Sequence, residues 1–253
     1  VGELKKSNNE KFFIRSNREA DMIKDLVNKS KSIFPKSAII NIWRKIIVAA
    51  NMHEQPLNIA IHNPKKVPDY AYLVKDYYND EVPLSFHDSL ATIVSDLEKG
   101  ETQIGIFALP KQDDKYDSDD NWWINLANNN LGIKIYAKIP FIDLEKDKVF
   151  DKIELVAVAV KEPEQSSEDN SLVCIEVEKE VSKDQLLKSL KENDLEARII
   201  KSVKSPQVEN IIFHLVELKG FYQEGDEALK NLAQSKIRPF VKVLGTYALP
   251  IKI

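Results

Sequence analysis

The stretch PKSAIINIWRKIIVAANMHE, residues 35–54, decides the fold of the N-terminal part of the chain. Its apolar side chains recur at helical spacing, so we expect a helix whose apolar face packs against other helices. The predicted buried stripe consists of Ile39, Ile42, Trp43, Ile46, Ile47, Ala49 and Ala50. It ends on Glu54, a carboxylate that is costly to bury unless a proton or a partner neutralises it. Two interpretations of Glu54 remain open: it has a function within the stripe, or it lies just past the buried region, where Gln55 and Pro56 end the helix.

A second predicted helix precedes this one. We expect Asn17 to cap a helix that begins at Arg18, with Glu19 in its first turn, where a negative charge suits the helix dipole. The apolar face of this helix consists of Ala20, Ile23, Leu26 and Val27. Residues 1–6, VGELKK, are typical of the basic end of an earlier helix. An Arg-Glu pair at a helix start is also common as ordinary dipole and surface chemistry, so the pair alone assigns no function.

Taken together, these three segments resemble the all-helical chorismate mutase family over residues 1–55. The family pattern is a lysine at the end of a long first helix, an Arg-Glu pair opening the second, and a Gln or Glu near the end of the third. Lys5, Arg18, Glu19 and Glu54 match it. The resemblance implies that Lys5 binds the ether oxygen and a carboxylate of chorismate and that Glu19 binds the ring hydroxyl. It also implies that Arg18 sets the local field, and that protonated Glu54 donates to the ether oxygen.

The same resemblance implies a homodimer with shared active sites. Because the rearrangement of chorismate to prephenate is unimolecular, it needs no cofactor and no metal. The family's long first helix is represented only by its tail, so we expect the helical domain to be incomplete in this sequence. Two positions depart from the family pattern: Ala50 stands where a carboxylate-binding serine is common, and Arg15 stands where an acidic residue is common.

The middle of the chain alternates between strand and helix patterns, which favours an α/β layer. Strands are expected at 57–62, 83–87, 102–109, 133–141 and 153–161, and helices at 69–78, at 89–99 and from Trp122. The segments IAIHNP (59–64) and DSLATIVSDLEKGETQIGIFALP (88–110) resemble the first lobe of prephenate dehydratase. The catalytic Thr-Arg-Phe triplet of that family is replaced by Asn-Ser-Leu-Val at 170–173, and no arginine lies between Arg44 and Arg198. These departures from the family pattern predict a dehydratase-like region without dehydratase activity.

A polar segment at 162–170 is the clearest predicted linker. After it we expect the βαββαβ order of a ferredoxin-like unit, with strands at 171–178, 197–205, 209–219 and 241–247 and helices at 183–193 and 226–235. The closing VKVLGTYALP (241–250) resembles the end of the ACT regulatory domain of prephenate dehydratases, which binds phenylalanine between paired copies. The Gly-Ala-Leu and Glu-Ser-Arg-Pro motifs of that family are not kept at 183–186 and 202–206.

Composition excludes several classes of function. The net charge is −4 without a basic block, so we expect no nucleic-acid partner, and the apolar runs are too short to span a membrane. Cys174 is the single cysteine, which leaves no disulfide framework or thiolate metal site, and the four histidines show no ligand spacing. The acidic stretch at 112–121 lacks the glycine and terminal glutamate of a calcium loop and is interpreted as a solvated loop. These features are those of a cytoplasmic protein.

The sequence thus predicts a multidomain α and α/β protein. Its parts are a chorismate mutase-like helical domain at 1–55, a prephenate dehydratase-like α/β lobe at 56–165 and an ACT-like domain at 166–253. The predicted activity is that of a chorismate mutase acting on chorismate. The alternatives are a non-catalytic regulatory or scaffold protein, or a small-molecule binding module that uses the cleft of the middle lobe.

Overall fold

The computed structural model describes residues 14–31, 33–111, 121–143, 153–162, 164–205 and 207–253. Lys5 and almost all of the acidic loop lie outside these residues. The helices are α2 (Ser16–Lys29), α3 (Lys36–Glu54), α4 (Asp69–Tyr77), α5 (Leu90–Lys99), α6 (Trp122–Ala127), α7 (Lys183–Glu192) and α8 (Glu227–Ala233). The strands are β1 (Ile59–His62), β2 (Leu84–His87), β3 (Ile104–Ala108), β4 (Ile133–Ile139), β5 (Ile142–Asp143), β6 (Leu155–Val160), β7 (Asp169–Glu178), β8 (Ala197–Lys204), β9 (Ile211–Lys219), β10 (Phe240–Ala248) and β11 (Ile251–Lys252). Within the described part of the chain, no helix is long and apolar enough to cross a membrane.

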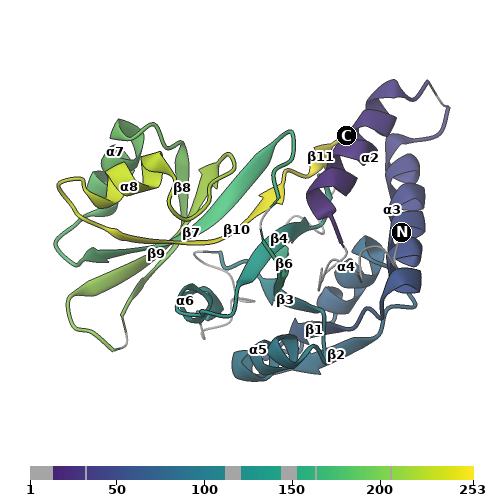
Figure 1. Cartoon of the computed structure of the whole chain (residues 1–253), viewed down its shortest axis with the longest axis horizontal. Coiled ribbons are helices and arrows are strands. Elements are labelled where there is room, and N and C mark those ends of the chain that lie inside the picture. Colours follow the sequence, from purple (N-terminus) through teal and green to yellow (C-terminus); the bar gives the residue numbers. More distant parts are fainter. Residues whose placement is uncertain (1–13, 32, 112–120, 144–152, 163, 206) are drawn as a thin grey trace.

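One nine-stranded sheet runs through the molecule in the order β2-β1-β3-β6-β4-β10-β7-β9-β8 (Figure 1). β1 pairs in parallel with β2 and β3, whereas β6 is antiparallel to both β3 and β4. The strands from β10 to β8 are antiparallel neighbours. β10 joins the two parts because it also pairs in parallel with β4, where Gly245 stands opposite Ile135. A side chain at Gly245 would collide with the Ile135 carbonyl, so only glycine permits this approach.

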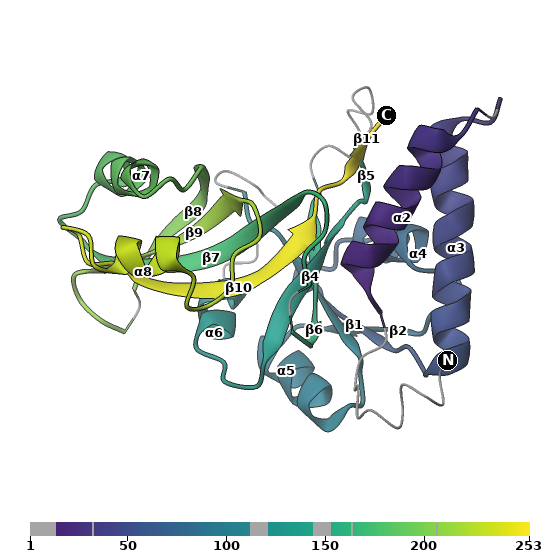
Figure 2. The same ribbon diagram turned by 45° about the horizontal axis from the view of Figure 1, so that its top comes forward.

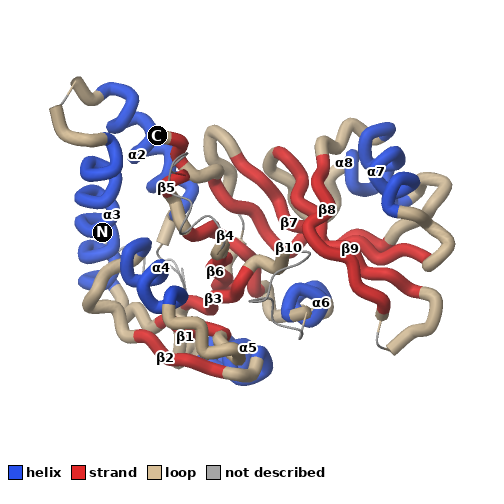
Figure 3. The backbone as a smooth tube through the Cα atoms, turned by 180° about the vertical axis from the view of Figure 1, so that it is seen from behind, coloured by secondary structure: helices blue, strands red, loops and turns tan. Residues whose placement is uncertain are grey.

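Each face of the sheet is covered by its own helices. α5 and α6 pack on one face, in a core that includes Trp122 and Trp123. On the other face, α2, α3 and α4 share one core with the first strands, and α7 and α8 share another with the last strands. Figures 2 and 3 show α6 and the pair α7–α8 on opposite sides of the C-terminal strands. The alternation along β7 agrees, because Leu172 and Val173 belong to different cores.

The C-terminal half, residues 169–248, has the predicted βαββαβ order. Its four strands lie in the order β10-β7-β9-β8, that is fourth, first, third and second, which is the ferredoxin-like arrangement. α7 begins with a capping box in which the Ser182 hydroxyl accepts from the Gln185 amide and the Gln185 side chain accepts from the Ser182 amide. The buried residues of its core all lie between 173 and 243. This half therefore has a hydrophobic core of its own.

α3 is a helix as predicted, but the predicted buried face was wrong. Most of the predicted stripe faces solvent instead: Ile42, Trp43 and Ile46 are 57%, 36% and 52% exposed, and Ala49 and Ala50 are exposed as well. Figure 1 shows α3 along the outer edge of the molecule, with α2 and α4 on its inner side. The helix therefore presents an apolar face that no other described part of the chain covers.

The inner face of α3 carries Ile40, Arg44 and Val48, which are buried. Arg44 is buried because its guanidinium lies 3.6 Å from the centre of the Tyr77 ring and 4.9 Å from that of Phe141. Its Nε donates to the Tyr77 carbonyl oxygen at 3.1 Å. Stacking between rings suits a planar, weakly hydrated guanidinium. A hydropathy pattern places arginine outside, so it selected the wrong face of this helix.

Candidate functional site

Glu19 and Asn51 connect the first turn of α2 with the last turn of α3. Asn51 Nδ2 donates to Glu19 Oε1 at 3.2 Å, and both side chains are half-buried. Asn51 and Glu54 are three residues apart in α3 and are therefore neighbours on its surface. The contact brings the Glu19 carboxylate to the turn of α3 that ends in Glu54.

The structure brings together some of the predicted catalytic residues. Glu54 is the last residue of α3 and is half-buried, so both interpretations of its place remain open. Arg18 lies next to Glu19 in α2 but is exposed. Lys5 lies outside the described residues. Glu19 thus lies near the helix turn that carries Glu54, whereas Arg18 lies on the surface.

Three tyrosines and a lysine lie close enough to Glu19 to feel its charge. The hydroxyls of Tyr78 and Tyr136 are 2.7 Å apart. Burial raises the pKa of Tyr77, Tyr78 and Tyr136, and the Glu19 charge adds to this effect. Burial also lowers the pKa of Lys161, an effect that nearby carboxylates including Glu19 oppose. This region therefore combines neutral phenols, a partly desolvated cation and a carboxylate.

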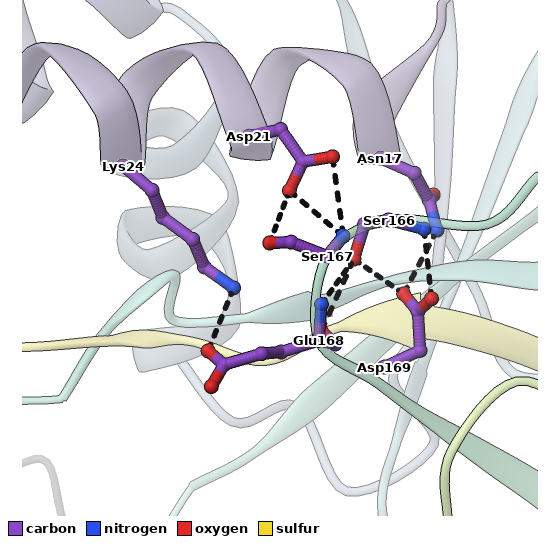
Figure 4. A network of polar contacts seen from close by, with 7 residues as sticks. All are labelled: Asn17, Asp21, Lys24, Ser166, Ser167, Glu168 and Asp169. Carbon is purple, nitrogen blue, oxygen red and sulfur yellow. Dashed lines mark hydrogen bonds and ion pairs between the residues drawn. The ribbon is translucent and has the colours of Figure 1, made fainter.

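Asn17 does not cap α2, contrary to the prediction. The helix begins at Ser16, and Asn17 is buried in its first turn. Its Nδ2 donates to the Glu164 carbonyl oxygen at 2.5 Å. The same Nδ2 donates to Asp169 Oδ1 at 3.2 Å (Figure 4). These partners are 147 and 152 positions away along the chain, so local sequence could not reveal them. The predicted linker at 162–170 is accordingly packed against α2, and β7 begins within it.

On the opposite face of the sheet, an ionic cluster lies at the carboxyl ends of β3, β4 and β10. Lys138 Nζ is 2.6 Å from Glu154 Oε1 and 4.0 Å from Glu217 Oε1. Lys138 comes from β4 and Glu217 from β9, and Glu154 immediately precedes β6. The cluster therefore links the middle strands to the C-terminal half.

Two further cations and a tyrosine complete this cluster. Lys111 Nζ lies 3.8 Å from Glu154 Oε2, and Arg198 Nη2 lies 2.8 Å from Glu217 Oε2. The Tyr247 hydroxyl donates to Glu217. Burial raises the pKa of Glu154, but the neighbouring lysines outweigh burial and leave this pKa lowered. Three cations thus face two carboxylates at an edge where parallel strands end, which is where open α/β sheets commonly bind ligands.

The described residues offer neither an activated thiol nor a metal site. Burial raises the pKa of the Cys174 thiol to about 12, so this thiol stays protonated and unreactive. His214 Nδ1 lies 2.8 Å from Ser202 Oγ, and burial lowers the His214 pKa to about 4. In the part of the chain that the structure describes, no group of three or more His, Cys, Asp or Glu side chains could hold a metal ion.

Sequence reasoning missed several residues of these regions. Asn51 could have been found, because it lies one helical turn before Glu54 on the same face of α3. Lys161, Tyr136 and Lys138 lie on or beside strands, and no local motif marks them. The neighbours of each follow from the pairing of β4 with β6, which a single sequence does not specify.

No known protein family matches the sequence, and no curated protein matches it either. Solved structures do match. GqqA, described as a novel type of quorum quenching acylase, has a TM-score of 0.56 at 11% identity, with 77% of this chain and 95% of that chain covered. Prephenate dehydratase from Streptococcus mutans has a TM-score of 0.52 at 13% identity, with 78% and 100% covered.

A third match is the prephenate dehydratase of Arthrobacter aurescens in complex with L-Phe. Its TM-score is 0.50 at 11% identity, with 76% of this chain and 90% of that chain covered. At such identities the likeness concerns the fold and not the chemistry of the site. The chain therefore has the mixed α/β fold of the prephenate dehydratases.

Proposed function

We propose that the protein is a chorismate mutase that rearranges chorismate to prephenate, with Lys5, Arg18, Glu19 and Glu54 at its site. The observation that carries the proposal is the hydrogen bond from Asn51 to Glu19, because it joins the two helix ends that bear these motifs. The prephenate dehydratase fold of the remaining chain adds support, since prephenate is the product of the proposed reaction.

The proposed chemistry needs only positioning and electrostatics. The substrate is a flexible dianion that must be held in its compact conformer while the ether bond breaks. A rate acceleration of about 10⁶ requires about 8 kcal/mol. Three or four charge-assisted hydrogen bonds of roughly 1.5–3 kcal/mol each reach that value. Lys5 and protonated Glu54 would bind the ether oxygen, Glu19 would bind the ring hydroxyl, and Arg18 would set the local field.

The proposal includes a homodimer formed through the exposed face of α3. A helix face with Ile42, Trp43 and Ile46 on the surface is typical of an interaction site. A second copy of the chain is the occupant that the shared active sites of this mutase type require. The oligomeric state, measured by light scattering after gel filtration, tests this part: we expect a dimer for the natural protein and a monomer for Trp43→Glu.

We further propose that the middle lobe has no dehydratase activity and that the C-terminal half is an ACT-like domain. The ferredoxin-like strand order supports the second part. The deciding experiment is chorismate depletion by the full-length protein, with prephenate and phenylpyruvate separated as products. Prephenate alone is the expected result. Phenylpyruvate in addition would contradict the inactive lobe, and a folded dimer without turnover would contradict the mutase.

The role of Glu54 has its own test. A glutamine donates a hydrogen bond at every pH, whereas a glutamate must carry a proton to do so. We expect Glu54→Gln to keep mutase activity and to move the pH optimum upward. Equal activity of the variant and the natural protein at every pH would contradict this role. Glu81→Gln, at an exposed surface position, serves as the control for charge removal.

The second candidate function is the binding of a small carboxylate by the middle lobe. The three cations of the ionic cluster, set against two carboxylates at the sheet edge, favour it. Titration calorimetry with prephenate tests it, with Lys111→Met as the variant and the exposed Lys29→Met as control. Binding that Lys111→Met weakens and Lys29→Met does not would favour this function.

A further inference from the structure

One polar face of α2 contacts residues 164–169, a segment that we call the strap. The strap follows β6 and ends on Asp169, the first residue of β7. Asn17, Asp21 and Lys24 are spaced four and three residues apart, so they form a single helix face. Figure 4 shows all three directed at the strap. Asp21 accepts from the Ser167 amide at 3.0 Å and from its hydroxyl at 2.6 Å, and Lys24 Nζ lies 3.3 Å from Glu168 Oε2.

The contacts between the strap and α2 differ in burial, and we therefore expect them to differ in their contribution to stability. The Asp21–Ser167 contact is exposed, and Glu168 is largely exposed. Exposed charged contacts contribute little to stability. Asn17 and Asp169, by contrast, are only 1% and 6% exposed. A buried polar group that loses its partner pays the full cost of desolvation, so Asn17 is the contact that the fold cannot lose without consequence.

Asn17 is held on both sides of its amide group. Its Nδ2 donates to the Glu164 carbonyl and to Asp169 Oδ1, while its Oδ1 accepts from Ser16 Oγ at 3.0 Å. The Ser16 hydroxyl also lies 2.9 Å from the carbonyl oxygen of Tyr136 in β4. The first turn of α2 is thereby fixed to the strap and to the sheet at the same point.

Asp169 belongs to the C-terminal half. It is the first residue of β7, where it stands opposite Ala248 of β10, and its carbonyl accepts from the Gly220 amide at 2.8 Å. Its carboxylate also accepts from the amide and the hydroxyl of Ser166, at 2.7 and 2.6 Å. The position of this carboxylate is therefore set by the start of β7, an inner strand of the ferredoxin-like sheet.

We infer that Asn17 is a positioning residue that couples the C-terminal half to Glu19. Glu19 lies two residues after Asn17 in the same helical turn, and its amide donates to the Arg15 carbonyl at 2.9 Å. A shift of Asp169 would therefore move the turn that presents the Glu19 carboxylate to Asn51. The inference rests on the proposed mutase function for its catalytic consequence, but not for the mechanical coupling itself.

The test uses the full-length protein and two independent measurements. Asn17→Ala removes the amide, Asn17→Ser is a milder change that cannot span to Asp169, and Glu168→Ala removes only the ion pair with Lys24, from a side chain that is 68% exposed. We expect both Asn17 variants to lower kcat by about 10- to 100-fold with KM within about twofold, as for a misplaced catalytic group. Glu168→Ala should leave kcat unchanged.

Hydrogen exchange is the second measurement. In Asn17→Ala and Asn17→Ser, amides of residues 16–24 and 48–54 should exchange about 5- to 10-fold faster, the size expected for the loss of buried hydrogen bonds. Unchanged exchange at 48–54 would overturn the coupling, and so would an equal effect of Glu168→Ala on kcat. If the natural protein does not convert chorismate, the proposed function fails, while the exchange at 48–54 still decides the coupling.

Discussion

The helix pair α2–α3 and the C-terminal half bury their apolar residues in different ways. The helices α7 and α8 pack on their own sheet, and the core beneath them contains buried residues only from 173–243. The buried residues of α2 and α3 instead share a core with α4, β1, β4, β6 and β10. The α7–α8 face of the C-terminal half thus has a local core, although the other face of its sheet packs with α5 and α6, whereas the helix pair has no core of its own.

This difference explains which face of each helix is buried. In α7 the buried residues Leu186 and Leu190 are apolar and lie four positions apart, the spacing of an amphipathic helix. In α3 the buried face contains Arg44, and the more continuous apolar stripe lies outside. A helix whose partners are local shows its core face in its own sequence. A helix whose partners are distant, or belong to another chain, does not.

The largest effect is expected from a charge placed on the two faces of α3. Val48→Asp buries a carboxylate without a partner at a position that is only 3% exposed, and should lower the free energy of unfolding by about 3–5 kcal/mol. Ile46→Asp, on the exposed face, should change it by less than about 0.5 kcal/mol in the monomer. Urea unfolding followed by circular dichroism measures both.

Val48→Asp and Ile46→Asp together also test which face of α3 is covered by a second copy of the chain. If a second copy covers the outer face, Ile46→Asp should convert the dimer to a monomer although the fold persists. Strong destabilisation by Ile46→Asp together with tolerance of Val48→Asp would mean that the burial of α3 described above is inverted. Light scattering on the folded variants separates these outcomes.

A smaller effect is expected from removing a buried side chain of the C-terminal half. Leu190→Ala leaves a cavity in a fully buried site and should destabilise by about 2–5 kcal/mol, whereas Leu187→Ala, at a 37% exposed position, should cost less than about 1 kcal/mol. Because this core is self-contained, hydrogen exchange should accelerate within 171–247 and remain unchanged in α3. Faster exchange in both regions would show that the two cores unfold as one.

The predictive power of the sequence follows the same division. The strand and helix patterns at 171–247 predicted the βαββαβ order of the ferredoxin-like half, because these signals lie within the elements they specify. Asn17 looked like a helix cap because its pattern was read locally, but its side chain is bound by Glu164 and Asp169. Contacts across nearly 150 positions leave no local signature.

For the candidate site, the sequence indicated which residues could act on a substrate, and the structure showed which side chains lie next to them. Glu19 and Glu54 were selected by resemblance, and the contact between Glu19 and Asn51 places them in one region. The tyrosines near Glu19 and the cluster around Lys138 depend on the register between β4 and β6. Register is set by tertiary packing, so these side chains were invisible to motif analysis.

The smallest effect on stability at neutral pH is expected from His214, a buried histidine of the C-terminal half. Burial lowers its pKa to about 4, compared with 6.5 when solvated. Between these values the unfolded chain binds a proton that the folded chain does not, so acid favours unfolding. Stability should be complete above about pH 6.5 and fall as the pH decreases toward 4.

His214→Gln removes this titration while it keeps a side chain that can bind the Ser202 hydroxyl. We expect the difference in melting temperature between the natural protein and His214→Gln to be independent of pH above 7 and to shift in favour of the variant between pH 6.5 and 4. His53→Gln, at an exposed position of α3, is the matched control and should leave the profile unchanged. Parallel profiles for the natural protein and His214→Gln across this range would mean that the acid sensitivity of the C-terminal half arises elsewhere, and that its self-contained core tolerates a charged imidazole.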